Sequence, residues 1–182
     1  MNNIKIFRRN EDVNIIYSKF LDCEIFPLDG TGISGLPSAS HIFICDYLYV
    51  TEATLLKIFI DDEICESFVL GLVDPDPETQ VDWVEYDCYP VCEINKACSI
   101  QELDIILRTP FKNINYASIN EFCESAFFFP LDMSWMCQVS TRFEAAIFWF
   151  SNEDILNFFI KRHKNITPFS PDALRERGIG FR

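Results

Sequence analysis

The chain has 182 residues, of which 49% are hydrophobic and 15% aromatic, and its formal net charge is −13. This apolar content can build a large core and excludes a disordered chain, while the negative charge argues against direct binding to nucleic acid or to an anionic membrane. The length fits one domain, so we expect residues 1–182 to form a single domain.

The N-terminal part of the chain predicts a strand, a helix and a loop. Residues 3–9 alternate between apolar and polar side chains, as a strand does. The apolar spacing in residues 11–23 fits a helix, with a strand as the alternative. Residues 27–40 are rich in glycine, serine and proline and predict a loop. Residues 41–50 are rich in β-forming residues.

The next elements are a short helix and two strands. Residues 51–62 predict a helix with Thr51 as its N-cap. Residues 64–73 predict a strand, and two prolines in residues 74–80 favour a turn or loop. Residues 81–88 alternate again, which suggests a strand that pairs with the preceding one.

Two segments carry the capping-box pattern, in which a serine and a glutamate three residues later satisfy each other's backbone N–H groups. Ser99 and Glu102 form the first pattern, which predicts a helix ending near residue 108. Ser118 and Glu121 repeat it at the start of residues 118–129.

The C-terminal third predicts a strand pair and then helices. Residues 135–151 suggest two strands around a turn near residue 140. Residues 151–164 are the clearest helix, with Ser151 as N-cap and basic residues in the last turn, where the helix dipole favours them. Residues 167–182 add a helical turn. The whole pattern predicts an α+β fold, a mostly antiparallel sheet with several packed helices.

The N-terminus lacks the apolar run of a signal peptide, and no window approaches the apolar length of a membrane span. We therefore expect a cytoplasmic protein that makes no membrane contact and whose cysteines are reduced thiols, mostly small core residues. The eight cysteines are Cys23, Cys45, Cys65, Cys88, Cys92, Cys98, Cys123 and Cys137.

Charge is segregated along the chain. No Lys, Arg or His lies between Lys57 and Lys96, whereas the last 22 residues hold six of the fifteen basic residues. The interval between the two lysines holds eleven acids: Asp61, Asp62, Glu63, Glu66, Asp74, Asp76, Glu78, Asp82, Glu85, Asp87 and Glu93. Such a run can be a solvated surface that keeps a protein soluble, or a contact surface for a basic partner.

Strand periodicity places Trp83 among these acids. If residues 81–88 keep a period of two, Trp83 shares one face with Glu85 and Asp87, and the other face is the better candidate for the core. An exposed aromatic among carboxylates suits the centre of an interface. The alternative is a β-bulge that turns Trp83 inward.

No metal, cofactor or catalytic site is expected. Five carboxylates of residues 74–85 fall in the frame of a calcium-binding loop, but Thr79 replaces the glycine that this loop requires. The cysteines at 88, 92 and 98 lack the paired spacing of a zinc site. The glycines of residues 30–35 match a dinucleotide-binding pattern, but no strand–helix unit surrounds them. His163, among basic residues at a helix end, is expected to be exposed.

In its size, its acidity and its residues 74–87, the chain resembles the immunity proteins of bacterial toxin–immunity systems, including the contact-dependent growth inhibition type. The resemblance implies a cytosolic inhibitor that binds a basic toxin, often a nuclease, and occludes its active site. The expected partner-binding residues are Asp74, Asp76, Glu78, Asp82, Trp83, Glu85 and Asp87. Two alternatives stay open: a metal-dependent enzyme that uses the clustered carboxylates, and an acidic nucleic-acid mimic aimed at a DNA-binding protein.

Overall fold

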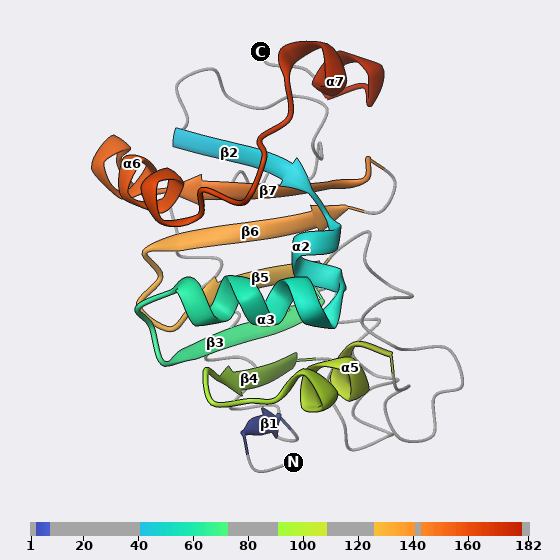
Figure 1. Ribbon diagram of the computed structural model, residues 1–182, viewed down its shortest axis with the longest axis vertical. Helices are drawn as coiled ribbons and strands as arrows, with labels where there is room; N and C mark the ends of the chain where they lie inside the picture. The colour runs from blue at the N-terminus through green and yellow to red at the C-terminus, as the bar shows by residue number, and fades with distance from the viewer. Residues whose placement is uncertain (1–2, 8–40, 73–90, 109–125, 141–142, 180–182) are drawn as a thin grey trace, which may run out of the picture.

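The computed structural model describes residues 3–7, 41–72, 91–108, 126–140 and 143–179. In this part of the chain, seven strands form one sheet in the order β1-β4-β3-β5-β6-β7-β2, and every neighbouring pair is antiparallel (Figure 1). The strands are β1 (Ile4–Ile6), β2 (His41–Asp46), β3 (Ser67–Leu72), β4 (Val91–Asn95), β5 (Ala126–Pro130), β6 (Trp135–Ser140) and β7 (Ala145–Phe150). The predicted α+β fold with a mostly antiparallel sheet is confirmed.

Helices cover one face of this sheet. The described helices are α2 (Leu48–Thr51), α3 (Ala53–Asp62), α5 (Ile100–Arg108), α6 (Glu153–Arg162) and α7 (Pro171–Glu176). In Figure 1, α3, α5 and α6 lie in front of the sheet, and α7 lies beyond its β2 edge. None of the helices in the described ranges has the length and apolar character that a membrane crossing requires.

Aromatic side chains form the centre of the layer between the sheet and the helices. Phe59 of α3 lies edge-on to Trp135 of β6, with ring centroids 5.5 Å apart. Phe159 of α6 packs 5.0 Å from Phe148 of β7 and 5.8 Å from Phe59. Such offset and edge-to-face contacts stabilise beyond the burial of apolar area alone. The rings therefore hold α3 and α6 at a defined place on the sheet.

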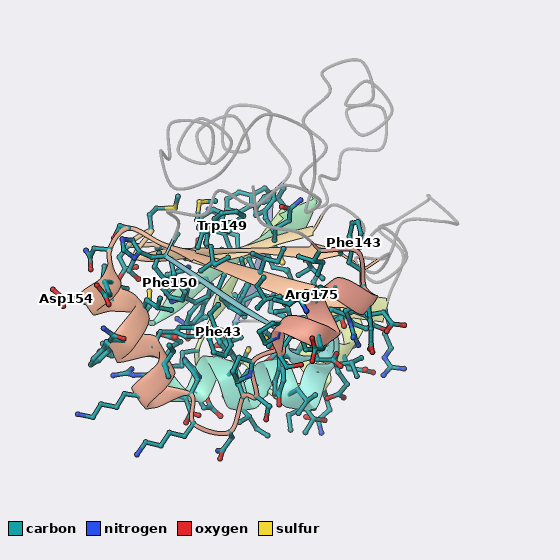
Figure 2. The ribbon with its side chains drawn as sticks, turned by 90° about the horizontal axis from the view of Figure 1, so that it is seen from above. Phe43, Phe143, Trp149, Phe150, Asp154 and Arg175 are labelled. Atoms are coloured by element: carbon teal, nitrogen blue, oxygen red, sulfur yellow. The ribbon has the colours of Figure 1, made fainter. Side chains whose placement is uncertain are left out.

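Both faces of the sheet are buried. In β5, Phe128 belongs to the cluster under the helices, while its neighbours Phe127 and Phe129 belong to a second cluster on the other face. Figure 2 shows the same division in β7, where Phe150 points toward the helices and Trp149 points away from them. Because successive strand residues alternate between faces, a strand buried on both sides is a continuous apolar run.

Two predicted N-caps are wrong by one residue. Glu52, not Thr51, caps α3, and its side chain accepts a hydrogen bond from the Leu55 N–H at 2.8 Å. Thr51 is the last residue of α2, where its hydroxyl bonds the Tyr47 carbonyl at 3.2 Å. An N-cap needs an extended backbone, which Glu52 has and a helical residue lacks.

The cap of α6 shows the same shift. Asn152, not Ser151, has the extended backbone of an N-cap, and its side chain accepts from the Ile155 N–H at 3.0 Å. The acids predicted in the first turn and the bases in the last turn of α6 are confirmed. The predicted helical turn near the C-terminus is α7, which Ser170 caps.

The capping box at the start of α5 is confirmed. The Ser99 N–H donates to Glu102 Oε2 at 3.0 Å, and the Glu102 N–H donates to Ser99 Oγ at 3.2 Å. The side-chain amide of Asn3 also donates to Glu102 Oε2, at 3.2 Å. These donors, the Ser99 backbone N–H foremost, lower the pKa of Glu102 to about 2.

The predicted pairing around β3 is wrong. We expected residues 81–88 to pair with this strand, but β3 has β4 on one edge and β5 on the other. Residues 81–88 themselves lie outside the described residues, as do residues 11–23, residues 27–40 and the Ser118–Glu121 pattern. The helix that this pattern predicts within residues 118–129 is wrong at its C-terminal end, because residues 126–129 are part of strand β5. The predicted strand pair around residue 140 is β6 with β7 and is confirmed.

Candidate functional site

All seven residues predicted to contact a partner fall within residues 73–90, outside the described part of the chain. The structure does show where this segment leaves and rejoins the sheet. It follows β3 and precedes β4, and these strands are neighbours with Gly71 opposite Val91. Leu70 and Val91 are fully buried. The acidic segment is therefore attached at both ends to the rigid core at one end of the sheet.

A small pocket lies at the opposite end of β3, which we call the corner pocket. It has a volume of about 310 Å³ and is bounded by the end of α3, the start of β3, the turn between β5 and β6, and α6. Its lining residues are Glu63, Ile64, Cys65, Asp132, Ser134, Trp135, Asp154, Ile155, Phe158, Phe159 and Arg162.

Hydrogen bonds from side chains to backbone carbonyls position the walls of the corner pocket. The helix α3 ends before Glu63, and Arg162 Nη1 of α6 donates to the carbonyl of Asp62 at 2.9 Å. Lys96 Nζ donates to the carbonyl of Glu63. These two cations satisfy carbonyls that a helix leaves free at its C-terminus, where positive charge is favourable. The end of α3 is thereby held against α6.

His163 is buried, so its predicted exposure is wrong. Only 3% of the residue is accessible, and its Nε2 lies 2.7 Å from Glu63 Oε1. The ring stacks on Phe59, with centroids 4.4 Å apart and planes 7° apart, and also contacts Phe159. As the C-cap of α6, His163 leaves the helical path and turns toward the core. Sequence spacing placed it among basic residues and carried no sign of this contact.

The His163–Glu63 pair is a structural contact between helices. In the described residues, no hydroxyl or thiol group forms a hydrogen bond with His163, as a nucleophile activated by this base would. The nearest thiol in sequence to Glu63, that of Cys65, donates instead to the Ser67 carbonyl at 3.0 Å. The arrangement satisfies two buried polar groups and orders the corner pocket.

The mouth of the corner pocket combines exposed apolar groups with carboxylates. Ile64 is 65% exposed and Phe158 is 51% exposed. Asp132 and Asp154 are also exposed, and neither forms an ion pair with another described residue. Figure 2 shows Asp154 at the outer end of α6, pointing away from the sheet. Among the described lining residues, Arg162 is the one cationic side chain, and it lies over the Phe158 ring, 4.6 Å from its centroid.

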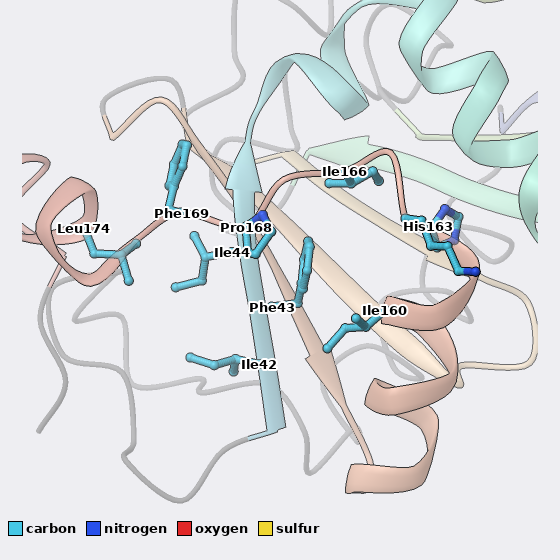
Figure 3. Close-up of a pocket in the computed structure, with 10 residues that line it drawn as sticks. Ile42, Phe43, Ile44, Ile160, His163, Ile166, Pro168, Phe169 and Leu174 are labelled. Atoms are coloured by element: carbon cyan, nitrogen blue, oxygen red, sulfur yellow. The ribbon is translucent and has the colours of Figure 1, made fainter.

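A larger pocket, of about 550 Å³, lies over the β2 edge of the sheet (Figure 3). Ile42, Phe43 and Ile44 of β2 line it together with Ile160 of α6. The chain after α6 crosses β2 here, and the Phe169 N–H donates to the Ile44 carbonyl at 2.8 Å. The residues of this lining that the structure describes include Lys164 and His163 but no carboxylate, so they differ in chemistry from those of the corner pocket.

The described thiols are free and mostly buried. Burial raises the pKa of Cys92 to about 12 and also raises that of Cys98, which keeps both thiols protonated. Cys88, the third member of the rejected zinc site, lies outside the described ranges. Within those ranges, no three His, Cys, Asp or Glu side chains come close enough together to hold a metal ion.

Comparison of the chain with protein-family models, with curated proteins and with solved structures finds no match. A function for this chain is therefore argued from its charge pattern and from the geometry of the described residues.

Proposed function

We propose that this chain is an immunity protein, an inhibitor that binds a basic toxin domain, such as a nuclease, and occludes its active site. One observation carries the proposal: eleven carboxylates and no Lys, Arg or His lie between Lys57 and Lys96. Exposed carboxylates without intervening cations raise the rate at which an oppositely charged protein associates, and they disfavour partners of like charge.

Several described carboxylates of this interval are accessible to a partner, although Glu63 is bonded to His163. Asp62 and Glu66 are exposed and form no ion pair with any other described residue. Asp61 is exposed as well, although Lys57 pairs with it. No described cation therefore neutralises the charges of Asp62 and Glu66, as a surface ion pair would.

The sheet provides a rigid support for the acidic segment. Binding is tighter when the contact residues lose little conformational entropy on association. Binding loops are often carried on rigid scaffolds, which limits this loss. Strands β3 and β4 pair along their whole length and hold both ends of residues 73–90. A basic nuclease presents cations where it binds phosphates, so carboxylates carried on this support can occupy the same positions.

A rescue experiment tests this function. A candidate toxin, found by co-purification with this chain from its native host or in the neighbouring gene, is expressed in a bacterium, with and without the chain. We expect toxicity without the chain, full growth with it, and a stable complex whose association rate falls as salt is added. Unchanged toxicity in the presence of the folded chain contradicts the proposal.

Thermal unfolding with and without divalent cations separates this function from the enzyme alternative. An inhibitor that works through its own carboxylates needs no metal, so we expect the melting temperature to be unchanged by calcium or magnesium. A rise with either ion favours the metal-dependent enzyme instead, because a ligand that binds only the folded state stabilises it.

A further inference from the structure

We propose that the corner pocket binds an arginine side chain from a basic protein partner, with the aliphatic stem against Ile64 and Phe158 and the guanidinium group between Asp132 and Asp154. This inference names a second contact surface of the proposed inhibitor and to that extent rests on the proposed function. The surface lies at the opposite end of β3 from residues 73–90.

The apolar groups at the mouth indicate a protein contact. Ile64 and Phe158 are among the most exposed large hydrophobic side chains of the described residues, and both line one concave site. Exposed apolar groups gathered at a hollow and rimmed by polar groups are typical of interaction sites. Scattered apolar residues elsewhere, such as Ile58 on α3, line neither of the two pockets.

The carboxylates at the mouth of the corner pocket favour a positively charged ligand. Asp132 and Asp154 are exposed and form no ion pair with a described residue, whereas Glu63 is already bonded to His163. Arg162 is held by the Asp62 carbonyl and the Phe158 ring, not by either of these aspartates. Asp132 accepts a hydrogen bond from the Ser134 N–H at 3.0 Å. Its carboxylate and that of Asp154 outnumber the cation of Arg162 in the described lining, which disfavours an anion or a second copy of this acidic chain.

Arginine fits this arrangement better than lysine. Its guanidinium group is planar, donates several hydrogen bonds to carboxylates and stacks on aromatic rings. Arg162, which lies over the Phe158 ring, shows that an arginine side chain can pack on this wall. The pocket volume of about 310 Å³ admits one long side chain rather than a folded element.

Trp135 provides a reporter for occupancy. The indole lines the corner pocket, and its Nε1 is buried without a hydrogen-bond partner among the described residues. Its N–H resonance should therefore respond to a charged group that enters the pocket. The probe is N-acetyl-arginine N-methylamide, and the matched control probe is the citrulline analogue, which has the same shape without the charge.

We expect saturable shifts of the Trp135 indole and of the Ser134 and Asp154 amides with the arginine probe only. The double variant Asp132→Asn/Asp154→Asn should weaken binding about threefold or more, since exposed ion pairs contribute modestly. Asp172→Asn/Glu176→Gln on α7, which removes the same charge elsewhere, should change nothing. Equal shifts with citrulline, or equal weakening by the control variant, overturn the proposal.

A second arm uses the basic partner of the rescue experiment. Asp132→Asn/Asp154→Asn and Phe158→Ala should each slow association or speed dissociation, whereas Asp172→Asn/Glu176→Gln and Ile58→Ala should not. If the chain still rescues growth but Asp132→Asn/Asp154→Asn and Phe158→Ala have no effect in either arm, the arginine site in the corner pocket is overturned. The inhibitor function is then unaffected. Arginine binding in the first arm with no rescue supports the pocket as a cation site and contradicts the function.

Discussion

The imidazole of His163 and the carboxylate of Glu63 lie 2.7 Å apart and join the C-terminal ends of α6 and α3, one hundred residues apart in the chain. Their side chains are 1% and 11% exposed. The contact closes one side of the corner pocket, because Glu63 and the adjoining Arg162 both line it. Its loss would therefore affect stability and the pocket together.

His163→Ala should lower the free energy of unfolding by about 3 kcal/mol, because it leaves a partly buried carboxylate without its partner and a cavity beside Phe59. Glu63→Gln should cost about 1 kcal/mol, since the amide can still form a hydrogen bond with the ring. Urea denaturation measures both, and Lys164→Ala, at an exposed neighbour, is the control. A loss for His163→Ala no larger than that of the control would show that the contact does not form.

The corrected N-cap of α6 can be tested by two neighbouring substitutions. Asn152→Ala should cost about 1 kcal/mol of stability, because it removes the acceptor of the Ile155 N–H. Ser151→Ala, one residue earlier, should stay within about 0.5 kcal/mol of the parent protein. The two are compared by thermal or urea denaturation. A larger loss of stability for Ser151→Ala than for Asn152→Ala would show that Ser151 is the N-cap, as the sequence pattern predicted.

The capping box of α5 should make the free energy of unfolding depend on pH in the acid range. Hydrogen bonds from Ser99 and Asn3 lower the pKa of Glu102 from 4.5 to about 2. A lowered native pKa stabilises the fold fully above pH 4.5, and this stabilisation is lost as the pH falls through about 2. Glu102→Gln should therefore destabilise at neutral pH and approach the parent protein near pH 2. A pH series of urea titrations measures the difference, with Glu176→Gln at an exposed position of α7 as the control.

Thiol labelling should follow burial. Cys65 is partly exposed, whereas Cys45, Cys92 and Cys137 are fully buried and burial raises their pKa values. At pH 8, an alkylating reagent should modify Cys65 much faster than these three, because the thiolate is the reactive form. Peptide mass mapping after timed labelling measures the rates, and the difference should vanish in denaturant. Equal rates in the native protein would contradict the described packing.

The acidic segment can be tested in complex with the basic partner. Charge reversal at Glu85 and Asp87 together with Trp83→Ala should weaken binding by about 2 kcal/mol or more, as central interface residues do. Reversal at Asp172 and Glu176 of α7 changes the charge by the same amount and should have a smaller effect. Titration calorimetry measures both. Unchanged binding with an intact fold would remove residues 74–87 from the contact surface.

Local patterns predicted much of the secondary structure. The capping box of Ser99 and Glu102 forms as expected, because its two reciprocal hydrogen bonds join residues only three positions apart. The additional donor, Asn3, is distant in the sequence and was not predicted. The strand pair β6–β7 forms for a similar reason, since its two strands are separated by a short turn. Where two cap-forming residues are adjacent, as at Ser151 and Asn152, composition alone cannot choose between them, and the backbone angle decides.

The sequence by itself determined the α+β class and the segregation of charge, because these depend on local periodicity and composition. Only the tertiary structure decided that β3 lies between β4 and β5, that His163 is buried against Glu63, and that Ile64, Asp132 and Phe158 surround one pocket. Each of these joins residues far apart in the chain, and such contacts are selected by the packing of whole helices and strands into one core, which no local pattern records.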